Sequence, residues 1–116
     1  MRVQLKQILL ITLLFPLLAF AQTFELKNGN SMCMVGKGAG QDATINPYGK
    51  QDSYATIENL GSIEFGIRIE KEKRVIRELL VKPKEVFKIQ LPKSSVSYLD
   101  SFDRKTARAS ILYSKD

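Results

Sequence analysis

The chain has 116 residues, a formal net charge of +6 at pH 7, one cysteine, and neither histidine nor tryptophan. The lack of histidine excludes His-based catalytic triads and HExxH metal sites, and a single cysteine excludes zinc fingers and a disulfide framework within one molecule. A chain of this length has room for one small hydrophobic core.

The first 21 residues are typical of a cleavable export signal. Met1–Gln7 carries two cations, Ile8–Phe20 is a nearly unbroken apolar run, and Ala19-Phe20-Ala21 supplies the small residues that a signal peptidase requires. The apolar run is too short to span a bilayer and contains Pro16. We therefore expect cleavage after Ala21, no stable transmembrane anchor afterwards, and a periplasmic or secreted protein of bacterial type.

Residues 22–116 are predicted to form one domain that begins with short strands. Thr23–Leu26 and Ser31–Val35 lie on either side of Asn28-Gly29-Asn30, a pattern that favours a tight hairpin. Glycine, proline and aspartate are frequent in 36–53, which we interpret as a long loop. After a short strand at Tyr54–Glu58, the segment Ile63–Glu70 alternates apolar and polar residues, as a half-buried strand does.

Charged and proline-containing turns separate the remaining predicted strands. These strands are Arg74–Val81, Val86–Leu91, a segment around Val96, Tyr98 and Phe102, and Thr106–Tyr113. Strands that recur at intervals of about ten residues are typical of antiparallel sandwiches and barrels.

Residues 70–82 also fit an amphipathic helix. Val75, Ile76, Leu79 and Leu80 would lie on one stripe of such a helix. The β-branched Val75-Ile76 pair, the lack of an N-cap residue and the closely flanking strands favour a strand instead. A helix here would change the fold to a small α+β domain.

The strand pattern predicts an all-β fold, a small antiparallel immunoglobulin-like β-sandwich of about six to eight strands. This likeness concerns the fold alone and transfers no functional residues. The predicted core consists of Ile57, Ile63, Phe65, Ile67, Ile69, Ile76, Leu79, Val81, Phe87, Ile89, Leu91, Ala109 and Ile111.

The motifs in the loop do not match known sites for cofactors or metals. Gly36-Lys37-Gly38-Ala39-Gly40 lacks the GK[ST] end of a phosphate-binding loop and the helix that follows one. Asp42, Asn46 and Asp52 do not have the spacing of a calcium loop, so we expect them to close turns on the backbone. We therefore expect no cofactor, no metal and no enzymatic activity, with a small enzyme as an alternative.

Cys33 and the basic residues give two further expectations. Cys33 lies among apolar neighbours, which predicts a reduced, buried strand residue, with an intermolecular disulfide or a reactive thiol as the alternatives. The cations between Lys71 and Lys88 alternate with glutamates, so we expect no nucleic-acid surface.

These observations favour an exported, non-catalytic binding or accessory module of the bacterial envelope, which acts through loops or an exposed strand edge. Its partner would be an envelope protein or a glycan; the alternative is an inhibitor or immunity-type protein that binds another exported protein. Loops as long as 36–53 are uncommon unless they are functional or disordered. We expect Ile45 and Tyr48 to anchor this loop, and its predicted partner-contact residues are Lys37, Gln41, Asp42, Asn46, Tyr48 and Lys50.

Overall fold

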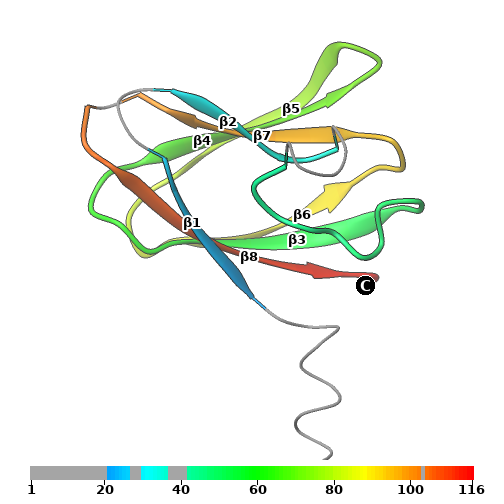
Figure 1. Ribbon diagram of the computed structural model, residues 1–116, viewed down its shortest axis with the longest axis horizontal. Helices are drawn as coiled ribbons and strands as arrows, with labels where there is room; N and C mark the ends of the chain where they lie inside the picture. Colours follow the sequence, from blue (N-terminus) through cyan, green and yellow to red (C-terminus); the bar gives the residue numbers. More distant parts are fainter. Residues whose placement is uncertain (1–20, 27–29, 37–41, 103) are drawn as a thin grey trace, which may run out of the picture.

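The computed structural model describes residues 21–26, 30–36, 42–102 and 104–116, which form an all-β sandwich of two antiparallel sheets (Figure 1). The predicted signal peptide, 1–21, lies outside the described residues except for Ala21. We call the sheet with the strand order β1-β8-β3-β6 the first sheet and the sheet with the order β2-β7-β4-β5 the second sheet. The strands are β1 (Gln22–Leu26), β2 (Ser31–Val35), β3 (Ser53–Asn59), β4 (Phe65–Lys71), β5 (Arg74–Val81), β6 (Val86–Leu91), β7 (Val96–Ser101) and β8 (Ala107–Ser114).

The strand order is that of a jelly roll. β1 pairs with β8, β2 with β7, β3 with β6 and β4 with β5, as if one long hairpin had been folded over on itself. The additional pairs β3–β8 and β4–β7 join these strand pairs into two four-stranded sheets. An immunoglobulin sandwich instead keeps its first two strands in one sheet. The connectivity therefore corrects the immunoglobulin-like expectation to a jelly-roll order, which implies no function by itself.

The predicted hairpin around Asn28-Gly29-Asn30 is wrong. β1 lies in the first sheet, where Leu26 pairs with Ala107, and β2 lies in the second sheet, where Ser31 pairs with Asp100. β1 and β2 therefore do not pair with each other. An Asn-Gly pair between two short strands is a local signal for a turn. The actual partners of these strands, β8 and β7, lie at the other end of the sequence.

The ambiguous segment 70–82 forms a strand and a turn, which excludes the helical alternative. Glu72 and Lys73 both have positive φ, at 54° and 66°, between the paired residues Lys71 and Arg74. Two consecutive residues with positive φ are typical of a type I′ turn, which matches the twist of a hairpin. The β4–β5 connection is the one hairpin within a sheet among the described strands.

The core lies between the two sheets and is close to the predicted one. Leu79 and Phe87 are only partly buried, and Ile76 is 49% exposed, so its assignment to the core is wrong. Ile76 lies on the edge strand β5 next to a register shift in the β4–β5 pairing. The core also contains residues that the sequence analysis did not select, namely Leu26, Met34, Ala55, Leu99, Ala107 and Tyr113.

Candidate functional site

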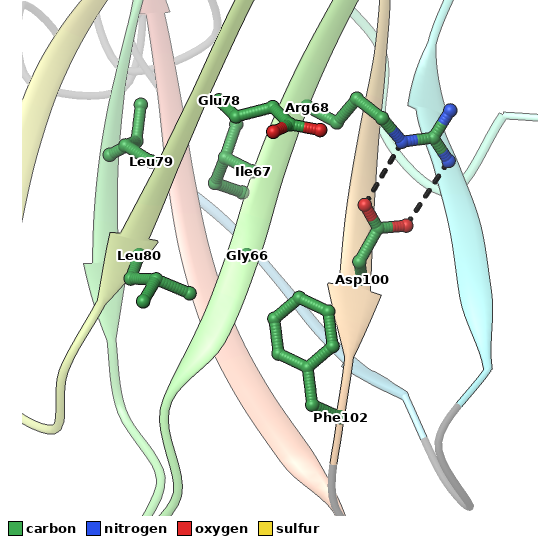
Figure 2. A pocket seen from close by; sticks show the side chains of 8 residues that line it. All are labelled: Gly66, Ile67, Arg68, Glu78, Leu79, Leu80, Asp100 and Phe102. Atoms are coloured by element: carbon green, nitrogen blue, oxygen red, sulfur yellow. Dashed lines mark hydrogen bonds and ion pairs between the residues drawn. The ribbon is translucent and has the colours of Figure 1, made fainter.

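A hollow of about 530 Å³ lies on the outer face of the second sheet (Figure 2). Its floor is Gly66 on β4. Leu80 on β5 and Phe102, which directly follows β7, lie on either side of Gly66. Leu80 is 52% exposed and Phe102 is 66% exposed, so the two apolar walls are open to solvent.

Gly66 allows the ring of Phe102 to lie close against β4. A Cβ atom on Gly66 would come within 2.9 Å of Cζ and 3.0 Å of Cε2 of Phe102. Glycine inside a strand often marks a close approach of this kind. The missing side chain therefore creates the hollow and lets the phenyl ring lie against the sheet.

Arg68, on β4, forms a charged network beside this hollow. Its Nε donates to Oδ2 of Asp100 at 3.0 Å, and its Nη2 donates to Oδ1 at 3.1 Å, which is a bidentate geometry (Figure 2). The guanidinium also pairs with Glu70 and lies 4.2 Å from the ring centroid of Tyr98. Ser31 donates a further hydrogen bond to Asp100.

The network holds both central groups in their charged forms. The hydrogen bond to Asp100 raises the pKa of Arg68 above its ordinary value, against the effect of burial. Burial acts to raise the pKa of Asp100, but hydrogen bonds from Arg68 and Ser31, together with the Arg68 charge, lower it overall. Because these opposite charges hold each other in their ionised forms, we interpret the network as a structural support for the hollow and not as a proton donor or acceptor.

The free edge of β5 continues the apolar surface. Among the strands that the structure describes, β5 pairs with β4 alone and forms one margin of its sheet. Val75 and Ile76 are each 49% exposed on this strand. An open edge with exposed apolar side chains can accept a further strand from another chain.

The predicted contact residues of the loop are only partly brought together. Lys37 and Gln41 lie outside the described residues. Asn46, Tyr48 and Lys50 line a second, shallow hollow of about 630 Å³.

Asp42 lies at the other end of the loop and bonds to β2. Its Oδ2 accepts from the Gly36 amide at 3.0 Å, and its Oδ1 accepts from Cys33 Sγ at 3.5 Å. Cys33 is half-buried, which corrects the expectation of a buried core thiol, because the next residue, Met34, fills the core instead.

The middle of the loop is held by side-chain amides. The Gln22 side chain donates to the Ile45 carbonyl at 2.7 Å and accepts from the Ile45 amide at 2.8 Å. Tyr48 packs against the core as expected, but Ile45 is 75% exposed and does not anchor the loop through its side chain. Asn46 Oδ1 accepts from the Tyr48 amide at 2.9 Å, which is the expected turn.

Within the described part of the chain, no three His, Cys, Asp or Glu side chains are placed so that they could hold a metal ion. Asp52 instead accepts from the Lys93 amide at 2.7 Å. Across the same residues, no helix is both long and apolar enough to cross a membrane.

The hollow over Gly66 was not predicted from the sequence. The one available signal was an isolated glycine at an outward position of the most regular strand, where glycine weakens a sheet unless something approaches it closely. Nothing in the sequence showed that Phe102 would be that group.

No protein family, curated protein or solved structure matches this chain.

Proposed function

We propose that this protein is an exported, non-catalytic binding module of the bacterial envelope, and that it holds a partner protein at the outer face and free edge of the second sheet. The observation that carries this proposal is the open hollow over Gly66, which lies directly beside the unpaired edge of β5. Leu80 and Phe102 give the hollow apolar walls, and surface apolar side chains gathered in this way are typical of interaction sites.

The partner is an extended segment that adds a strand to β5. Backbone hydrogen bonds along the edge would supply much of the affinity, and an apolar side chain seated between Leu80 and Phe102 would supply specificity. Glu78 also lines the hollow and is exposed. A basic residue in the partner segment would complement its carboxylate.

Site-specific photo-crosslinking in cells that export the protein tests this proposal. A crosslinker placed at Leu80 or Phe102 should give adducts with one partner. The same crosslinker at Val86, which is 55% exposed on the edge strand β6 of the first sheet, should give none.

The test also distinguishes the predicted loop surface. Adducts at Tyr48 and Lys50, with none at Leu80 and Phe102, would place the contact at the loop and contradict the edge-strand proposal. Adducts at Val86 as strong as those at Leu80 would indicate that the crosslinks are unspecific.

A further inference from the structure

We propose that the tip of the β4–β5 hairpin, residues 71–77, docks on an anionic lipid bilayer. This surface adjoins the free edge of β5 but does not include the residues that line the hollow over Gly66, and the inference does not depend on the proposed partner protein. It rests on how far the hairpin projects, on which side chains it exposes and on their charge.

The hairpin tip projects beyond the rest of the sandwich. β7 follows β4 as far as the pair Glu70↔Val96, and beyond it Lys71 and Arg74 pair with each other. Figure 1 shows this hairpin extending past the neighbouring strands. Arg77 pairs with Ile69, which faces the core, and yet Arg77 is exposed. The first sheet therefore does not cover this part of β5.

Two apolar side chains lie together on this projecting ribbon. Val75 and Ile76 are consecutive residues, and each is 49% exposed. In a regular strand, one of two consecutive side chains faces the core. Here a register shift lies beside the pair and the first sheet does not extend over it, so both side chains are exposed. Both side chains can therefore enter the boundary between headgroups and acyl chains.

The charge of the hairpin tip selects anionic lipid. The cations are Lys71, Lys73, Arg74 and Arg77. The acids are Glu72 and, at the base, Glu70, which pairs with Arg68, and the exposed Glu78. None of the four cations forms an ion pair with any residue that the structure describes. Apolar side chains flanked by unpaired basic residues are the combination that favours an anionic membrane surface.

The first test is vesicle co-sedimentation of the protein as recovered after export. Vesicles of phosphatidylcholine alone are compared with vesicles that contain roughly one-third phosphatidylglycerol. Each basic residue near an anionic surface contributes about 1 kcal/mol, so R74Q/R77Q should lower the partition coefficient about 30-fold. The control K82Q/K84Q removes two exposed cations from the turn between β5 and β6, at the end of β5 opposite the tip, and should lower it only slightly.

All variants share the same N-terminus, so the ratios between them report on the hairpin alone. Equal losses in the two charge variants would show that only the total charge matters and would overturn the proposal. Binding to polyglutamate with the same affinity and the same dependence on the variants would assign the hairpin tip to acidic polypeptides and would also overturn it.

The second test concerns the apolar pair. V75T/I76T keeps the β-branched shape that a strand favours but removes three carbon groups from contact with lipid, at about 0.8 kcal/mol each if fully buried. We expect at least a tenfold loss of partitioning with an unchanged melting temperature. Undiminished binding would refute insertion.

A fluorescence measurement locates the contact directly. The chain contains no tryptophan, so I76W introduces a single reporter at the tip. Its emission should shift to the blue with phosphatidylglycerol vesicles and should be quenched by brominated lipid. V86W, on β6 of the other sheet, is the matched control and should do neither. Equal quenching at both positions would contradict docking through the hairpin.

Discussion

The buried side chain of Asn59 is predicted to make a large contribution to the stability of the sandwich. This side chain is 2% exposed at the end of β3. Nδ2 donates to the carbonyls of Ile63 at 2.8 Å and Val81 at 2.9 Å, and Oδ1 accepts from the Gly61 amide at 2.9 Å. One amide therefore joins β3, the turn before β4 and the end of β5.

The substitution Asn59→Ala removes all three hydrogen bonds. The carbonyls of Ile63 and Val81 belong to buried residues, and a buried polar group left unpaired costs about 1–1.5 kcal/mol at the low end of measured values. The half-buried Gly61 amide can be reached by water and should cost less. With the small cavity left behind, we expect a loss of about 3 kcal/mol of unfolding free energy, or roughly 12–24 °C in melting temperature.

Urea unfolding followed by far-UV circular dichroism measures this loss. The matched control is Asn46→Ala, at a half-buried loop position. It also removes a side-chain amide, whose Nδ2 donates to the Ser53 hydroxyl at 3.0 Å and whose Oδ1 accepts from the Tyr48 amide at 2.9 Å. We expect a smaller loss there, about 1–1.5 kcal/mol, because only the hydroxyl of buried Ser53 loses its partner in the interior, whereas water can reach the amide of half-buried Tyr48. N59D should be at least as damaging as N59A at pH 7, since a carboxylate cannot donate to two carbonyls. Losses below about 1 kcal/mol for N59A, or equal to those of N46A, would refute the reasoning.

Three further predictions follow from burial and charge. Ile67→Ala, in the core, should cost about 3 kcal/mol, whereas Ile76→Ala, on the exposed edge, should stay within about 0.5 kcal/mol; equal values in urea unfolding would contradict the assignment of Ile76 to the surface. The Ser97 hydroxyl is buried with no hydrogen-bond partner among the described residues, so S97A should leave the melting temperature unchanged or raise it, and a clear decrease would show that the hydroxyl is satisfied. Because the pKa of Asp100 lies below its ordinary value of 3.8, its pairing with Arg68 stabilises the fold above that pH and is lost as the pH falls through the lower folded value. The stability advantage of the wild type over D100N should therefore shrink below about pH 4, and an advantage that does not change with pH would count against the ion pair.

The local pattern of the sequence was sufficient to predict the strands. Alternation of apolar and polar residues has the period of a strand, and it gave β4, β6 and β8 to within a few residues of their observed bounds. It also identified most of the core, because a residue such as Ile67 faces the interior whichever sheet its strand joins. The turn residues between strands were equally local and were placed correctly around residues 71–74.

Strand partners, and with them both candidate surfaces, were decided by the tertiary structure. Pairing β1 with β8 and β2 with β7 depends on contacts between the two ends of the chain, which no local pattern specifies. Ile67 was placed correctly in the core, but Ile76 was not, because the position of β5 at the edge of the sheet leaves that part of the strand uncovered. The hollow over Gly66 likewise exists only because Phe102, 36 positions later in the sequence, folds back over a residue with no side chain. Periodicity shows which face of a strand is apolar, whereas only the packed structure shows whether another layer covers that face.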